Sequence, residues 1–185
     1  MARRVLVRLP SGQGRFARET LAAMSSLHRL SSSDKRRRPA VRVGEPRPPA
    51  ELRRYYRAAE KRFGVGWHVL AAINFVETGF GKLRNESTAG ARGPMQFIPA
   101  TWRAYGMGGD VRDPRDAIMG AANYLRASGA PGNLRRALYA YNPTPLYVDA
   151  VRRYARRIAD DPRAFYTLHA WSVYWGGERV TGPGR

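Results

Sequence analysis

The run GWHVLAAINFVE, residues 66–77, is the most apolar segment with the length and composition of a helix. Gly79 follows it closely, and glycine commonly ends a helix because it adopts a left-handed conformation without strain. The uncharged part of the run is too short to cross a bilayer, which takes roughly 20 residues. The run therefore predicts a helix in the core of the fold.

Segments on both sides of this run also predict helices, because each is bounded by proline, glycine or a capping polar residue. No long stretch alternates with the period of two that is typical of strands. The sequence therefore predicts an all-α domain over residues 50–160, with a helical extension over 161–185. The helices are expected at about 51–63, 99–105, 113–128, 133–141, 144–159 and 162–175.

The first 49 residues differ in composition from the rest of the chain. They contain Ser31–Ser33, the basic run Lys35–Arg38 and several prolines. Such a composition predicts a basic, largely irregular arm or linker, with one short helix between Phe16 and Leu30. The N-terminus has basic residues but no apolar segment, so no secretory signal is visible in it.

The overall composition narrows the possible functions. The chain of 185 residues has 33 Lys and Arg against 14 Asp and Glu, a net charge of +19. It has no cysteine, which excludes disulfides, thiolate metal sites and cysteine catalysis. The three histidines lie far apart without ligand spacing, and no phosphate-binding glycine loop is present. We therefore expect no metal ion and no cofactor.

Glu77, at the end of the apolar run, is the candidate catalytic residue. On a helix, Ile73 and Asn74 lie on the same face as Glu77. Burial there disfavours the charged carboxylate and raises its pKa, and the negative C-terminal end of the helix acts in the same direction. These are the properties of a general acid that works near neutral pH. The alternative is a surface carboxyl in the last helical turn.

Two later segments carry groups suited to a sugar ligand. The first is STAGARGPMQFIPATW, residues 87–102, in which Gln96 offers hydrogen-bonding groups and Phe97 offers an aromatic face. The second is AYN, in which Tyr141 ends a helix and can reach a neighbouring carboxyl. The alternative for the first segment is an ordinary turn with its aromatic side chains in the core. The alternative for the second is a tyrosine packed in the core, followed by Asn142 as the residue that caps a turn.

The order of these features, a helix-terminal glutamate, then GPMQFIPATW and then AYN, resembles the lytic transglycosylases of bacterial cell walls. The resemblance covers about residues 51–155 and is greatest to the membrane-bound B-type and actinobacterial branch. It implies a lysozyme-like α-helical fold with Glu77 as catalytic acid and base. It also implies a substrate-binding set, with its tyrosine near the catalytic carboxyl, formed by Ser87, Met95, Gln96, Phe97, Tyr141 and Asn142.

The activity implied by the resemblance is cleavage of the β-1,4 bond between N-acetylmuramic acid and N-acetylglucosamine, with a 1,6-anhydromuramic end as product. The acetamido group of the substrate assists, so one carboxyl is sufficient. A hydrolytic muramidase is the nearest alternative, and it needs a second carboxylate roughly 5–9.5 Å from the first. Glu86 and Asp110 are the candidates for that role. A non-catalytic wall-binding or nucleic-acid-binding protein is the third interpretation.

The expected partner is the peptidoglycan glycan strand. A strongly positive chain is attracted to the carboxylates of peptidoglycan and to anionic wall polymers. Lys35–Arg38 has the composition of a phosphate-binding arm for nucleic acid, but an arginine-rich coding bias explains this charge equally well. We expect a monomer that acts outside the cytoplasmic membrane, where this substrate lies.

Overall fold

The computed structural model describes residues 18, 20–22, 25, 40–175 and 178–181. The short helix expected between Phe16 and Leu30 lies largely outside the described residues, and the basic run Lys35–Arg38 lies wholly outside them.

The helices predicted from residue 51 onward are present, and all except the last begin and end within two residues of the predicted positions. In chain order they are α3 (Pro49–Phe63), α4 (Trp67–Thr78), α5 (Pro99–Tyr105), α6 (Pro114–Ala127), α7 (Leu134–Tyr141), α8 (Pro145–Asp160) and α9 (Arg163–His169). Within the described part of the chain, the strands are β1 (Val173–Trp175) and β2 (Glu178–Thr181), which form one antiparallel hairpin. The all-α prediction is confirmed.

Capping residues set several of these helix ends as the sequence predicts. The side chains of Asp113, Asn133 and Thr144 accept backbone N–H bonds at the starts of α6, α7 and α8. These bonds satisfy N–H groups that have no partner inside the helix. Gly64 and Gly79 follow α3 and α4 in left-handed conformations.

The last helix is shorter than predicted, because α9 ends at His169 instead of continuing to Trp175. The buried side chain of Lys82 donates hydrogen bonds to the carbonyls of His169 (2.5 Å) and Trp171 (2.6 Å). In a longer helix these carbonyls would accept bonds from later backbone N–H groups. The described part of the extension over 161–185 is therefore one short helix followed by the hairpin.

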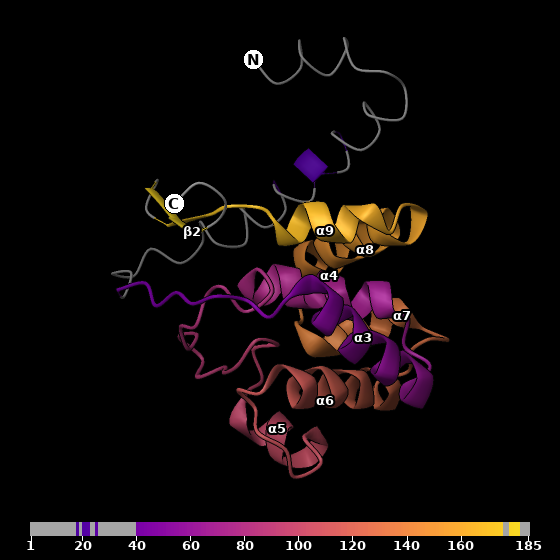
Figure 1. Ribbon diagram of the computed structural model, residues 1–185. Coiled ribbons are helices and arrows are strands. Elements are labelled where there is room, and N and C mark those ends of the chain that lie inside the picture. The colour runs from indigo at the N-terminus through magenta and orange to yellow at the C-terminus, as the bar shows by residue number, and fades with distance from the viewer. Residues whose placement is uncertain (1–17, 19, 23–24, 26–39, 176–177, 182–185) are drawn as a thin grey trace.

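Helix α4 lies at the centre of the fold. Figure 1 shows it between α9 on one side and α6 on the other. Its side chains are buried from Val69 to Asn74, and Leu70 and Ile73 are completely inaccessible. Each such aliphatic side chain contributes about 1.5–3 kcal/mol through burial. No helix in the described residues is long and apolar enough to span a membrane.

Two buried polar residues of α4 tie it to the loop before α5. The Asn74 side-chain amide donates to the carbonyl of Pro94 (3.0 Å) and accepts from the Tyr56 hydroxyl (3.1 Å). The Thr78 hydroxyl donates to the same Pro94 carbonyl (2.7 Å). Buried polar groups are costly when unpaired, so these bonds fix the position of the loop against the helix.

Gly93 brings this loop against the chain segment that precedes α6. Its φ is +73°, and a Cβ atom placed on it would lie 1.8 Å from the carbonyl oxygen of Val111. Only glycine fits a position that is both left-handed and so close to another backbone. Gly64 has nearly the same φ, +71°, but nothing lies within 4 Å of its Cβ position.

This pair of glycines gives a matched test of the fold. Gly64→Ala should lower the free energy of unfolding by about 1 kcal/mol, the cost of left-handed backbone in an L residue. Gly93→Ala should lower it by about 1–3 kcal/mol more, because the added methyl group displaces the loop from Val111. Urea denaturation measures both values. Equal costs for the two substitutions would contradict the close approach.

Candidate active site

The carboxyl of Glu77 lies at the C-terminal end of α4, beside the first turn of α8. The hydroxyl of Tyr147 donates a hydrogen bond to Glu77 Oε1 at 2.7 Å. Glu77 is partly buried, and Tyr147 is 1% exposed. No basic side chain among the described residues forms an ion pair with Glu77.

The surroundings of Glu77 favour its neutral form. Burial raises the pKa of Glu77 from 4.5 to about 7, and the hydrogen bond from Tyr147 opposes this rise. Burial also raises the pKa values of Tyr141 and Tyr147 well above 10, and the Glu77 charge raises them further. At neutral pH both tyrosines are therefore donors, while Glu77 is close to the midpoint of its titration.

Tyr141 lies next to this pair but does not bond to Glu77. Its hydroxyl donates to the backbone carbonyl of Met95 at 2.7 Å. Its ring is parallel to that of Tyr147, with centroids 6.4 Å apart. The tyrosine in direct contact with the carboxyl is therefore Tyr147, which the sequence analysis missed. The available signal was its place in the first turn of α8, in helical spacing with the buried residues Val151 and Tyr154.

A shallow pocket opens beside Tyr141, lined in part by Gln96, Phe97, Thr101 and Tyr124. Phe97 is 3% exposed, so little of its ring is available to a ligand. The Gln96 amide donates to the carbonyl of Gly93 at 3.1 Å. This bond holds one end of the Gln96 side chain within the loop.

Met95, Ser87 and Asn142 are less directly placed for contact with a sugar. The Met95 side chain is completely buried, and this residue offers the site only its backbone carbonyl. Ser87 is exposed, and its hydroxyl accepts a bond from the Ala91 N–H at 3.0 Å. Asn142 ends α7 through its own N–H. None of the three forms a hydrogen bond with Glu77.

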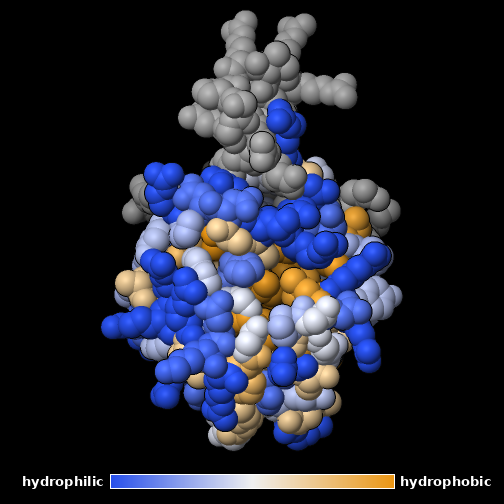
Figure 2. All heavy atoms as spheres, turned by 90° about the vertical axis from the view of Figure 1, so that its right-hand side faces the viewer, coloured by the Kyte–Doolittle hydropathy of each residue, from blue (hydrophilic) through white to orange (hydrophobic). Residues whose placement is uncertain are grey.

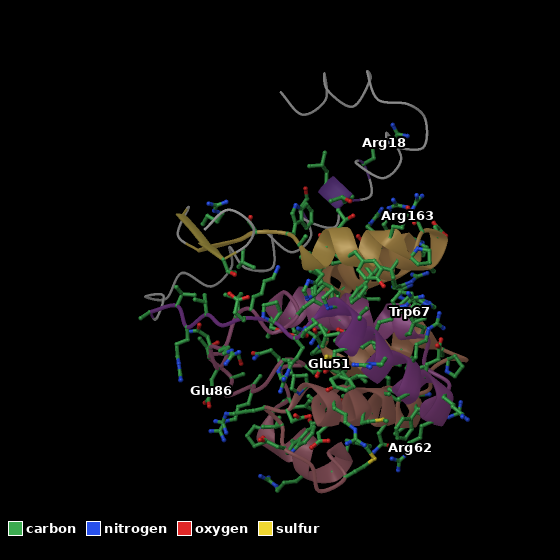
Figure 3. All side chains as sticks on the ribbon, in the orientation of Figure 1. Arg18, Glu51, Arg62, Trp67, Glu86 and Arg163 are labelled. Atoms are coloured by element: carbon green, nitrogen blue, oxygen red, sulfur yellow. The ribbon has the colours of Figure 1, made fainter. Side chains whose placement is uncertain are left out.

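The two candidates for a second carboxylate have other partners. Glu86 Oε1 pairs with Arg92 (3.1 Å) and Arg112 (3.4 Å). Asp110 Oδ1 accepts a bond from the backbone N–H of Arg112 at 2.8 Å. Figure 3 shows Glu86 on the loop away from the helices. The described residues contain no group of three or more His, Cys, Asp or Glu side chains placed to hold a metal ion.

Comparison with known proteins identifies the family. The Transglycosylase SLT domain matches residues 54–162, a segment that contains Glu77, Tyr141 and Tyr147. The chain belongs to this family. The predicted lysozyme-like transglycosylase class is therefore confirmed, whereas the narrower B-type and actinobacterial resemblance stays a prediction. No solved structure matches the chain.

The proteins to which this chain is similar are named as lytic murein transglycosylases. A membrane-bound lytic murein transglycosylase F of Thiobacillus denitrificans is 31% identical over 147 residues, which is 74% of this chain and 30% of that protein. A protein of the same name from Pseudomonas fluorescens is 30% identical over 116 residues, covering 58% and 24% of the two chains. The chain thus spans less than a third of the length of these relatives.

The raised pKa of Glu77 predicts a pH-dependent stability. The folded state holds this proton more tightly than the unfolded state, so the contribution of Glu77 to stability is greatest below pH 4.5 and falls as the pH rises to about 7. The loss from this residue should be at most about 3.5 kcal/mol, since the pKa rises from 4.5 to about 7 and one pKa unit is worth about 1.36 kcal/mol. Urea denaturation across this range should show that Glu77→Gln abolishes the loss and that Glu86→Gln keeps it. An unchanged pH dependence in Glu77→Gln would contradict the burial of this carboxyl.

The contact with Tyr147 predicts the direction of a further pKa change. Its hydrogen bond lowers the pKa of Glu77, so Tyr147→Phe should raise that pKa above about 7. An NMR titration of the Glu77 side-chain carboxyl carbon measures this change. Tyr139→Phe, at an exposed tyrosine on α7, is the control and should leave the pKa unchanged. A lower or equal pKa in Tyr147→Phe would mean that this bond is absent in solution.

Proposed function

We propose that this protein is a lytic transglycosylase that cleaves the glycan strands of peptidoglycan. The observation that carries the proposal is the partly buried carboxyl of Glu77, with a pKa of about 7 and a hydrogen bond from Tyr147, in a transglycosylase domain. Near neutral pH such a carboxyl is able to give up a proton and later take one back. The relatives are named as lytic murein transglycosylases, which supports the same substrate class.

In the first step, protonated Glu77 donates to the oxygen that joins C1 of N-acetylmuramic acid to N-acetylglucosamine. The C1–O bond breaks, and its electron pair stays on the leaving oxygen. The carbonyl oxygen of the substrate's acetamido group then bonds to C1 and stabilises the positive charge. This assistance replaces a nucleophilic carboxylate from the protein.

In the second step, the Glu77 carboxylate removes the proton from the C6 hydroxyl of the same muramic acid. The C6 oxygen bonds to C1 while the bond from the acetamido oxygen breaks. The product is a 1,6-anhydromuramic end, and Glu77 has recovered its proton without consuming water. A pKa near neutrality suits both steps, because the same group serves as acid and as base.

Tyr147 serves this reaction by orienting the carboxyl. Its donated bond occupies Glu77 Oε1, so Oε2 is the oxygen available for proton transfer. The bond also favours the carboxylate that forms after the first step, which limits how far burial raises the pKa. Tyr141 holds the Met95 carbonyl and thereby positions the loop beside the carboxyl.

The pocket beside Tyr141 is the proposed binding site for a sugar of the strand. Gln96 offers its side-chain carbonyl oxygen there, because its amide nitrogen donates to the carbonyls of Gly93 and Asn85. Phe97 and Tyr141 supply aromatic surface. Ser87 and Asn142 are proposed to contact substrate from the neighbouring loops, and Met95 to act through its backbone carbonyl. No cofactor enters this scheme.

Closure by the C6 hydroxyl is favoured over hydrolysis by the state of the other carboxylates. Glu86 is paired with two arginines, which hold it in place as their counter-ion. Asp110 bonds to the backbone that leads into α6. Neither carboxylate is hydrogen-bonded to Glu77 or Tyr147.

The surface fits a highly charged wall polymer. Figure 2 shows a face on which hydrophilic residues surround a smaller hydrophobic area. With a net charge of +19, the chain is attracted to polyanions. We propose that it acts as a monomer outside the cytoplasmic membrane, on peptidoglycan and its associated anionic polymers. A role in nucleic-acid binding is the alternative, and competition by DNA for peptidoglycan binding would favour it.

The reaction is tested by incubating the protein with purified peptidoglycan and weighing the released muropeptides by mass spectrometry. We expect anhydromuramic ends from the wild type. Glu77→Gln should lower release at least about 1,000-fold, because it removes both the acid and the base. Circular dichroism should show that this variant is folded.

Other products would contradict the proposal in distinct ways. Products heavier by one water would mean hydrolysis. No release from the wild type would mean a binding role. Full activity in Glu77→Gln would place the catalytic acid elsewhere.

A further inference from the structure

Two arginines and a glutamate form an exposed cluster on the loop side of the site. Arg92 Nε and an Arg112 amino group both contact the same atom, Glu86 Oε1, at 3.1 Å and 3.4 Å. The three side chains are 44%, 67% and 46% exposed, in the order Arg92, Arg112 and Glu86. The cluster is thus built into the surface and open to solvent.

The fold assembles this cluster from two separate loops. Arg92 is fixed because its backbone N–H and carbonyl both pair with Phe97, at 2.9 Å each. The close approach of Gly93 to Val111 then brings the next residue, Arg112, to the same place. A glycine required by geometry therefore places two guanidinium groups side by side.

The two guanidinium groups of the cluster have hydrogen-bond donors that Glu86 does not use. Each guanidinium carries five N–H groups, and each uses one of its nitrogens on Glu86. One carboxylate balances only one of the two charges. Asp110 lies nearby and keeps its negative charge, but its carboxylate accepts the backbone N–H of Arg112 and forms no ion pair with either guanidinium group. Adjacent guanidinium groups with free donors are suited to a second carboxylate.

We propose that Arg92 and Arg112 bind a carboxylate of the peptide stems that branch from the glycan strand. This inference rests on the proposed function, because it gives the same site a preference for strands that carry peptides. The cluster adjoins the sugar pocket, since Phe97 pairs with Arg92 and also lines that pocket. Glu86 pre-orients the two guanidinium groups and competes with the incoming carboxylate.

Binding is measured in the Glu77→Gln background, so that no strand is cleaved. The probes are purified peptidoglycan and the same material after an amidase has removed its peptides, which leaves a lactyl carboxylate but no peptide carboxylate on each muramic acid. Co-sedimentation should show that the double variant Arg92→Gln/Arg112→Gln binds peptide-bearing strands about tenfold more weakly, as loss of charge-assisted hydrogen bonds predicts. Its binding to bare glycan should be unchanged. Glu86→Gln should bind peptide-bearing strands more tightly, because the competing carboxylate is gone.

The matched control is Arg54→Gln/Arg135→Gln, which removes the same charge from exposed positions on α3 and α7. It should leave both affinities close to those of the parent. Equal weakening in the control would assign the effect to net charge and overturn the proposal. The proposal would also be overturned if Arg92→Gln/Arg112→Gln weakened binding to both probes, or to neither of them. If the wild type cleaves nothing but this binding pattern holds, the proposed reaction fails and the peptide-binding cluster stands.

Discussion

The partial burial of the Glu77 carboxyl is the constraint on which the rest of the site depends. A glutamate at the end of an ordinary surface helix would be ionised at neutral pH and useless as a proton donor. Here α4 is buried along most of its length, and Tyr147 covers its last turn, so burial holds the pKa of Glu77 at about 7. The free-energy cost of burying the charged carboxylate raises its pKa, and the raised pKa allows Glu77 to donate a proton near neutral pH.

The neighbouring loop depends on the same helix. Asn74 and Thr78, on successive turns of α4, both bond to the Pro94 carbonyl. Tyr141 binds the next carbonyl, that of Met95, from the end of α7. Three side chains from two helices thus hold a short loop segment beside the carboxyl. Because the loop is fixed at its backbone, its side chains at Gln96 and Phe97 keep a defined relation to Glu77.

Helices were predictable from the sequence because their signals are local. Proline, glycine and capping residues mark most helix ends, and the apolar run of α4 indicates burial directly. The C-terminal hairpin was not predictable, because Lys82, nearly 90 residues away, binds the carbonyls that end α9. Hydrogen bonds between distant segments leave no periodic pattern in a single sequence.

In the site, too, some features could be predicted from the sequence and others could not. Glu77 could be predicted, because its burial follows from its own helix. The contact of Tyr147 with Glu77 could not, since it depends on how α8 crosses α4. The loop motif predicts Met95 as a substrate-binding residue, but it does not indicate that the Met95 side chain is buried and that its backbone carbonyl binds Tyr141. The cluster of Arg92 and Arg112 depends on the approach of two loops at Gly93.

The most direct measurement of the central claim is the pH dependence of kcat/KM for glycan release. If buried Glu77 is the proton donor, the rate should fall as the pH rises through about 7, because the carboxyl then loses its proton. A rate that stays constant or increases well above that pH would contradict the account.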